Sequence, residues 1–289
     1  MFKLCLLFSI LISSHVVNAQ NPFSGKSFYV NPTFQANIDR TISNMKSSEP
    51  DYQKTVNNLK IARNSPSAYW LDVMRKVQLN SVGLDTMNGI LLDAAKQSPA
   101  TLVVFIVYNL PNRDCHAKAS NGELCCYPNP DKKCDYLKPG NCEEGLNTYK
   151  SQYIDNIANI ASKYKDKVPM AFVIEPDSMP NLVTNTDTPA CGNIATQTAY
   201  KEGITYAVNK FNAAVPEVPL YLDLAHGNWL GWINNAEPAA RMIKSWNIVD
   251  KLRGFATNVA NYQPMGLPCP EALFCLPHKN NLAHPCCAD

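Results

Sequence analysis

The chain of 289 residues lacks an excess of charge of either sign. Its 26 basic and 24 acidic side chains leave a formal charge of +2, and the basic ones form no stripe. Nucleic acid and anionic membrane surfaces are bound by such basic stripes. We therefore predict neither as a partner. The sequence also has no usable N-x-Ser/Thr sequon, so nothing in it predicts N-glycosylation.

Several short catalytic motifs are missing as well. The sequence contains no G-x-S-x-G elbow, no H-E-x-x-H zinc motif, no P-loop and no G-x-G-x-x-G turn. These absences disfavour the common serine-esterase, zinc-peptidase and nucleotide-binding sites. We predict that the protein uses no cofactor and no metal ion.

After residue 19, no apolar run approaches the ~18–20 residues that are needed to cross a bilayer. The first 19 residues combine a positive start, Met1-Phe2-Lys3, with an apolar stretch over residues 4–17 and a small residue, Ala19, at the expected cleavage site. This pattern is typical of a secretory signal peptide, and a membrane anchor is the alternative. We predict a secreted, extracellular protein without a membrane segment once residues 1–19 are removed.

The cysteines support the same compartment. Of eleven, Cys5 lies in the signal, which leaves an even set of ten and predicts disulfides rather than a cysteine nucleophile. Residues 124–145 hold four cysteines and three prolines without periodicity, and we interpret them as an inserted disulfide-tied loop. Its four cysteines can pair in three ways, and a zinc site is the alternative, although the stretch has no histidine. Residues 263–289 form a second segment rich in proline and cysteine.

Helical and strand patterns alternate along most of the chain. Apolar residues recur with helical spacing in residues 34–45, 52–62, 87–95, 149–164 and 200–215. Runs rich in β-branched and aromatic residues predict strands near residues 70, 104, 172, 221 and 256. Such alternation indicates parallel strands joined by right-handed crossovers, and hence an α/β sheet or barrel.

Acidic side chains follow three of the predicted strands. Asp114 follows the second strand, Glu175 and Asp177 follow the third, and Asp223 ends the fourth. The same segments carry Tyr108, Trp229 and Trp232. Because ligands bind at the carboxyl ends of parallel strands, we expect these residues to lie together at that end of the predicted sheet or barrel.

Clustered carboxylates raise the pKa of at least one member, and an acid of raised pKa can protonate the leaving oxygen of a glycosidic bond. A single acid at a strand end is more often a helix cap or part of a loop ion pair. Its repetition beside tryptophans, which suit the faces of sugar rings, favours a carbohydrate hydrolase.

Five motifs, in this order, resemble glycoside hydrolase family six, the inverting β-1,4-glucanases that include cellobiohydrolases and endoglucanases. They are "AYWLD" (68–72), "VYNLPNRDCHAKASNGE" (107–123), "VIEPDSMPNLVTN" (173–185), "YLDLAHGNWLGW" (221–232) and "LRGFATNVANY" (252–262). The resemblance implies a distorted parallel β/α barrel with an active-site tunnel or cleft. It assigns residues 20–262 to the catalytic domain, 124–145 to an insertion and 263–289 to a divergent tail.

The resemblance also implies roles for single residues. Asp177 matches the general acid, and Asp114 matches the aspartate that keeps the pKa of this acid raised. Asp223 matches another active-site aspartate near the same subsite, and Tyr108 the tyrosine that helps to distort the reacting sugar ring. Glu175 is then the structural member of its pair of acids.

The remaining matches concern sugar binding and one disulfide. Sugar-binding positions are matched by Trp70, Asp72, Asn185, His226, Trp229, Trp232 and Asn261. Ser120 lies in the loop that positions the attacking water. Cys115 and Cys191 match a disulfide between two catalytic loops.

The recognised motifs end at Tyr262, and only five strands are predicted where a closed barrel has about eight. We therefore expect a barrel that is incomplete at its C-terminal end and lacks the region that carries the proposed base. Two functions compete. The first is a secreted, monomeric glucanase that cleaves the β-1,4-glucosidic bonds of cellulose or related β-glucans with inversion. The second is a catalytically impaired remnant that binds glucan. A small disulfide-rich interaction protein is disfavoured by the long α/β pattern.

Overall fold

Five parallel strands form one sheet whose spatial order follows the chain, β1-β2-β3-β4-β5. The computed structural model describes residues 21–117, 119–131, 133–261 and 263. The strands are β1 (Tyr69–Leu71), β2 (Val103–Val107), β3 (Met170–Ile174), β4 (Leu220–Asp223) and β5 (Gly254–Ala256). Leu71 lies beside Val107, Val107 beside Ile174, and Ile174 beside Leu222. The carboxyl ends of the first four strands are therefore level, and all five predicted strands are confirmed.

Helices join the strands. They are α1 (Pro32–Asn44), α2 (Tyr52–Arg63), η1 (Met74–Val77), α3 (Met87–Ala94), α4 (Glu143–Thr148), η2 (Tyr149–Ile154), α5 (Asp155–Tyr164), α6 (Ser178–Thr184), α7 (Pro189–Gly192), α8 (Ile194–Ala214), α9 (Gly227–Leu230), α10 (Ile233–Ser245) and η3 (Val249–Lys251). The predicted helices are confirmed, although the one at 149–164 begins with a π-helical stretch, η2. α8 begins earlier than predicted because Asn193 caps it by accepting the N–H of Ala195.

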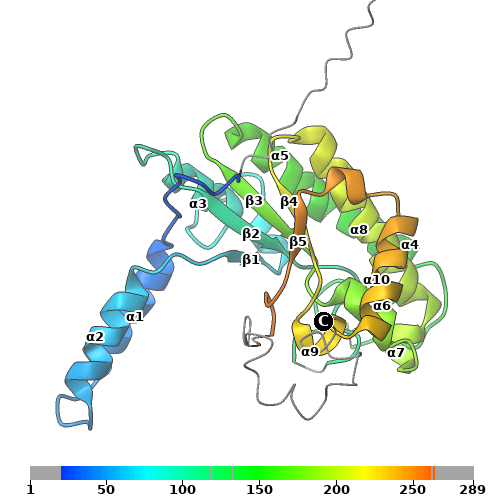
Figure 1. Ribbon diagram of the computed structural model, residues 1–289, viewed down its shortest axis with the longest axis horizontal. Coiled ribbons are helices and arrows are strands. Elements are labelled where there is room, and N and C mark those ends of the chain that lie inside the picture. Colours follow the sequence, from blue (N-terminus) through cyan, green and yellow to red (C-terminus); the bar gives the residue numbers. More distant parts are fainter. Residues whose placement is uncertain (1–20, 118, 132, 262, 264–289) are drawn as a thin grey trace, which may run out of the picture.

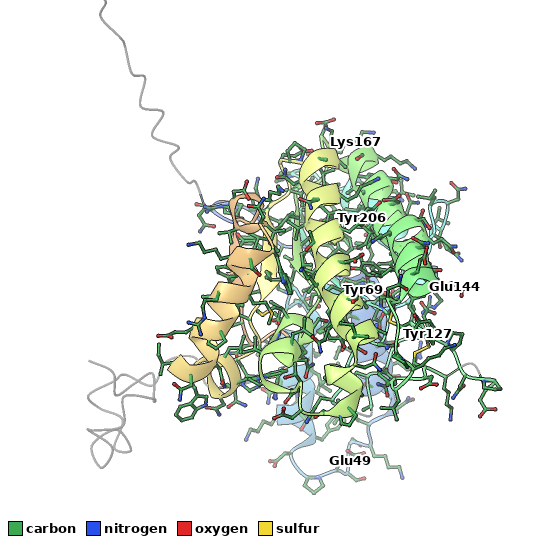
Figure 2. The ribbon with its side chains drawn as sticks, turned by 90° about the vertical axis from the view of Figure 1, so that its right-hand side faces the viewer. Glu49, Tyr69, Tyr127, Glu144, Lys167 and Tyr206 are labelled. Carbon is green, nitrogen blue, oxygen red and sulfur yellow. A yellow bond between two sulfur atoms is a disulfide. The ribbon has the colours of Figure 1, made fainter. Side chains whose placement is uncertain are left out.

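The helices α5 and α8 cover one face of the sheet, and Figure 2 shows this helical layer, with Tyr206 on α8 and Glu144 on α4. Alternate strand residues point into this layer. The Phe172 ring lies 5.0 Å from that of Phe211 on α8 and 6.2 Å from that of Phe105 on β2. Right-handed crossovers place successive helices on the same side of a parallel sheet, as in the wall of a β/α barrel.

The opposite face carries a second, smaller apolar cluster. Ile106, Tyr108 and Val173 are buried there, and Trp70 and Tyr221 pack against them. These residues alternate along the strands with those of the main core, which explains why the runs are apolar on both faces. The arrangement is a parallel α/β wall of the barrel type, in which β1 and β5 are the outer strands of the described sheet.

The α1 and α2 helices pack against each other as an arm that extends away from the sheet (Figure 1). Asn31 starts this arm, because its side chain accepts the N–H of Thr33 and Pro32 occupies the first helical position. None of the residues in α1 is buried. The arm is therefore stabilised by few contacts with the core.

Three disulfides occur in the described chain. Cys115 bonds to Cys191, the pair implied by the family resemblance. Within the insertion, Cys125 bonds to Cys134 and Cys126 bonds to Cys142, which selects one of the three possible pairings. The zinc alternative for residues 124–145 is wrong, because all four thiols are used in these bonds.

Among the described residues, none of the helices combines the length and apolarity that a membrane crossing requires. The predicted signal at residues 1–19 and the tail beyond Gln263 lie outside the described residues. The assignment of residues 20–262 to one catalytic domain remains a prediction.

Candidate active site

The first residues after β2, β3 and β4 include five described non-glycine residues in the left-handed backbone region. Their φ angles are 57° at Asn112, 58° at Asp114, 44° at Glu175, 62° at Asp177 and 53° at Ala225. Residues other than glycine adopt this region at an energetic cost, and such residues cluster at functional sites. The strained positions coincide with the strand ends where the sequence predicts the acids.

Asp177 and Asp223 are joined by a direct hydrogen bond. The main-chain N–H of Asp177 donates to Oδ1 of Asp223 at 2.9 Å, and the N–H of Ala225 donates to the same oxygen at 3.0 Å. The other oxygen, Oδ2, is buried and has no partner among the described residues. Burial raises the pKa of Asp223 to about 7; the two N–H groups oppose this increase, and the charge of Asp177 adds to it.

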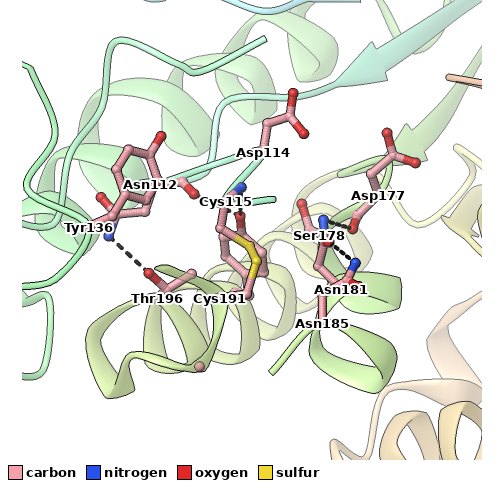
Figure 3. The surroundings of a disulfide bond; sticks show 12 residues. Asn112, Asp114, Cys115, Tyr136, Asp177, Ser178, Asn181, Asn185, Cys191 and Thr196 are labelled. Carbon is pink, nitrogen blue, oxygen red and sulfur yellow. Dashed lines mark hydrogen bonds between the residues drawn. A yellow bond between two sulfur atoms is a disulfide. The ribbon is translucent and has the colours of Figure 1, made fainter. Parts of the chain in front are cut away.

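Asp177 itself has the properties of a proton donor. Burial raises the pKa of its carboxyl to about 6, and the nearby charge of Asp114 adds to the increase. Figure 3 shows the two carboxylates pointing toward the same side of their loops, with the Cys115–Cys191 disulfide between the loops. A carboxyl of this pKa holds a proton in mildly acidic solution, whereas an ordinary aspartate does not.

Contacts with α6 hold the backbone at Asp177. The Asp177 carbonyl accepts the main-chain N–H of Asn181 at 3.2 Å and the Asn181 side-chain amide at 2.8 Å. Asn185 donates to the Asn181 side chain at 2.6 Å (Figure 3). Asn185 is therefore connected to the acid through Asn181.

Tyr108 lies just after β2, on the face of the sheet that carries the smaller apolar cluster. Its ring meets that of Trp70 edge to face at 5.3 Å, and the guanidinium of Arg113 lies 4.4 Å from the ring centre. Burial raises the pKa of Tyr108 well above its ordinary value, and the charge of Asp114 adds to this. Tyr108 therefore keeps its proton and can donate a hydrogen bond.

Arg113 organises the loop, a role that the sequence did not reveal. It donates to the carbonyl oxygens of Asp72 at 2.7 Å, Tyr108 at 2.5 Å and Ser120 at 3.0 Å. In the sequence, the only signal for this role is the position of Arg113 next to Asp114, because the residues that it contacts are far apart along the chain. The Asp72 carboxylate forms an ion pair with Lys76 at 2.6 Å.

The segments that follow β4 and β5 supply the remaining predicted residues. Trp229 donates its indole N–H to Thr184 on α6 at 2.6 Å, and its ring lies 5.9 Å from that of His226. Asn261 lies 3.2 Å from Nε2 of His226. Burial lowers the pKa of His226, so the imidazole is neutral near pH 7. Trp232 donates its indole N–H to the carbonyl of Asn228 at 3.3 Å.

The structure brings most of the predicted site residues to one edge of the sheet. Asp114, Asp177, Asp223 and Tyr108 lie together, with Trp70 on one side and the Trp229 loop on the other. Ser120 is exposed, and its carbonyl contact with Arg113 is what connects it to this group. Over the described chain, no cluster of three or more histidine, cysteine or acidic residues is arranged to hold a metal ion.

The parallel β/α sheet thus gathers carboxyls of raised pKa and aromatic side chains at its carboxyl edge, where ligands bind in such folds. The family model described as glycosyl hydrolases family 6 matches residues 23–278. This match runs past Tyr262, where the recognised motifs end. The chain therefore belongs to glycosyl hydrolase family 6.

Individual relatives agree with this assignment. The chain is 38% identical over 260 residues to 1,4-beta-D-glucan cellobiohydrolase C of Emericella nidulans, with 87% of this chain and 51% of the relative covered. Among solved structures, the catalytic domain of Cellulomonas fimi Cel6B has a TM-score of 0.71 at 33% identity, with 85% of this chain and 53% of that chain covered.

A second structure is cellobiohydrolase II (Cel6A) from Humicola insolens in complex with glucose and cellotetraose. It has a TM-score of 0.70 at 28% identity, and the comparison covers 93% of this chain and 70% of that chain. The chain spans about half the length of the first curated relatives that it matches.

Proposed function

We propose that this protein hydrolyses the β-1,4-glucosidic bonds of cellulose or related β-glucans, with Asp177 as the general acid. The observation that carries the proposal is the environment of Asp177, which is partly buried near Asp114 and tied by its main-chain N–H to Asp223. Membership of family 6 and relatives named as cellobiohydrolases support the substrate class.

The carboxyl of Asp177 transfers its proton to the glycosidic oxygen as the bond between that oxygen and the anomeric carbon breaks. A water molecule attacks the anomeric carbon from the opposite face and passes a proton to the surrounding water, so that the configuration is inverted and the net charge is unchanged. Asp114 favours the protonated form of Asp177 before the reaction. Asp223 fixes the backbone that carries the acid through its Oδ1 contacts.

Aromatic side chains on both sides of the acids suit a chain of sugar rings. Trp70 and Tyr108 lie on the side of β1, whereas Trp229 and Trp232 lie in the loop after β4. Stacking on their faces would bind successive glucose units while Asp72, Ser120, Asn185, His226 and Asn261 supply polar contacts. We further propose that the protein is secreted and acts as a monomer.

Sugar release from amorphous cellulose tests the proposal. The wild type should release reducing sugar, and Asp177→Asn should lose at least ~99% of this activity, since general acid catalysis contributes about 10²–10⁴-fold. Asp187→Asn is the matched control, because Asp187 is an exposed aspartate on the loop after α6 and its variant should keep full activity.

Unchanged activity in Asp177→Asn would refute the assignment of the acid. Binding to cellulose without sugar release by the wild type would instead identify the chain as a glucan-binding remnant. The anomeric form of the first product, followed by proton NMR, tests inversion: fresh product should be the α-anomer.

A further inference from the structure

Glu175 is an acid that the proposed reaction does not use, and it is completely buried. Its side chain faces the helical layer, where the hydroxyl of Tyr149 on η2 donates to Oε1 at 2.8 Å. None of the ion pairs of the described chain includes it. Burial raises its pKa to about 7, against the effect of hydrogen bonds from Asn109, Tyr149 and Leu110. Because Glu175 has no exposed surface, it acts through other residues rather than on a glucan.

Its carboxylate holds the main chain at the point where β2 ends. The N–H of Asn109 donates to both oxygens, at 3.1 and 3.2 Å, and the N–H of Leu110 donates to Oε2 at 3.3 Å. Asn109 and Leu110 are themselves completely buried, and neither N–H has another acceptor among the described residues. Without the carboxylate, two main-chain donors would be buried and unsatisfied, which is unfavourable enough to displace the loop.

The main chain of Glu175 extends the same connection. Its N–H donates to the carbonyl of Val107 at 2.8 Å, which continues the pairing of β2 with β3 beyond the last strand residue. Glu175 thus joins the end of β2 to the end of β3 through both its backbone and its side chain. Asp177 follows two residues later on the β3 side.

The anchored residues lie between two groups of the active site. Tyr108 directly precedes Asn109, and Asp114 ends the turn that starts at Leu110. The far end of this turn has its own contacts, since the carbonyl of Asn112 accepts the hydroxyl of Tyr200 at 2.7 Å. At the near end, Tyr153 and Arg113 bind the main chain of Tyr108, and the Glu175 carboxylate binds the N–H groups of Asn109 and Leu110 that follow.

We propose that Glu175 is a positioning residue, which fixes the loop after β2 against the loop after β3 and so places Tyr108 and Asp114 relative to Asp177. The proposal deepens the proposed function and rests on it, because the groups that it places are those of the glucan hydrolysis. The same contacts can also be tested without any turnover.

The first test is Glu175→Met, which keeps the length and unbranched shape of the side chain but removes both accepting oxygens, because Oε2 alone accepts both N–H groups and a glutamine oxygen could keep them. We expect kcat on a soluble cello-oligosaccharide to fall at least ~10-fold while KM stays within about twofold, because sugar stacking on Trp229 and Trp232 is untouched. A variant that is only less stable keeps its kcat at a temperature where it is folded. It would therefore not show a lower kcat at an unchanged KM.

Asp135→Asn is the matched control. Asp135 also accepts two main-chain N–H groups, from Leu137 at 3.0 Å and Lys138 at 3.2 Å, but it lies in the insertion and outside the proposed site. Its kcat should equal that of the wild type. A Glu175→Met variant that is folded and has kcat within about twofold of an active wild type would overturn the proposal.

Amide hydrogen exchange, measured by NMR, separates this proposal from the proposed function. The N–H groups of Asn109 and Leu110 should be protected in the wild type and exchange at least ~10-fold faster in Glu175→Met. If the wild type releases no sugar, the proposed function is refuted. The exchange rates still test whether Glu175 anchors the loop after β2. If the N–H groups of Asn109 and Leu110 exchanged at free-peptide rates in the wild type, the anchoring by Glu175 would be refuted.

If Glu175→Met does not fold, Glu175→Asp takes its place. It keeps the charge, but the side chain is one methylene shorter and cannot reach both N–H groups. We expect the same loss of kcat and the same faster exchange. A Glu175→Asp variant with kcat within about twofold of an active wild type, and with both amides still protected, would overturn the proposal.

Discussion

Replacement of Asp223 by asparagine should change the dependence of stability on pH. In the wild type, Oδ1 of Asp223 accepts the N–H groups of Asp177 and Ala225, whereas Oδ2 is buried without a partner among the described residues. Asparagine can keep both contacts through its own oxygen and place its amide group where Oδ2 was. The substitution therefore removes a titrating group and preserves its shape.

The expected effect follows from the pKa of this carboxyl, which burial raises from 3.8 to about 7. Because the folded chain binds the proton more tightly than the unfolded chain, the contribution to stability is fully present below pH 3.8 and is lost as the pH rises to about 7. At ~1.36 kcal/mol for each pH unit, the loss is about 4 kcal/mol. Asp223→Asn should match the wild type near pH ~4 and be more stable by ~2–4 kcal/mol at pH ~8.

Urea unfolding, followed by tryptophan fluorescence with the disulfides intact, measures this difference across the pH range. Asp187→Asn, at an exposed site, should follow the wild type at every pH. If Asp223→Asn and the wild type lost stability in parallel between pH ~4 and ~8, folding would not raise the pKa of Asp223, and the electrostatic account of the site would be wrong.

Two further variants test the loops around the acid. Asp114→Asn should lower the pKa of Asp177, because a negative charge near the acid is removed; the alkaline limb of the kcat/KM profile then moves to lower pH, and an unmoved limb would contradict the role of Asp114. Replacing both Cys115 and Cys191 with alanine removes a link across 76 residues and should lower the free energy of unfolding by ~2–5 kcal/mol in guanidinium chloride. A loss under ~1 kcal/mol would mean that other contacts hold these two loops together.

Some elements that shape the site were not predictable from local pattern. The α10 helix was missed, and it contains Pro238 inside its span, a residue that normally ends a helical pattern. The short α6 begins directly after Asp177, and contacts from Asn181 to the Asp177 carbonyl hold its first turn. Short helices of this kind depend on tertiary contacts more than on the propensity of their residues.

The pairing of the cysteines could not be predicted from the local sequence pattern either. Four cysteines within residues 124–145 predicted disulfides but allowed three connectivities, since sequence spacing does not determine which sulfur atoms meet. The pairing of Cys125 with Cys134 and of Cys126 with Cys142 depends on how the loop folds against α4 and η2.

Local order along the chain was enough to predict the parallel α/β arrangement and the edge at which the acids gather. Apolar runs specify strands, helical spacing specifies crossovers, and parallel strands bring their carboxyl ends to one edge. Hence the order of residues along the chain alone places Asp114, Asp177 and Asp223 near one another.

Folding in three dimensions was needed to give these acids different roles. The pKa of each depends on burial and on neighbours from other strands, and Glu175 and Asp177 show this, since they are two residues apart and face opposite surroundings. Arg113 likewise gains its role from Asp72, Tyr108 and Ser120, which meet only in the folded chain. Electrostatic interactions act through space, so a linear pattern can show which charges are present but not which of them are close together or shielded from water.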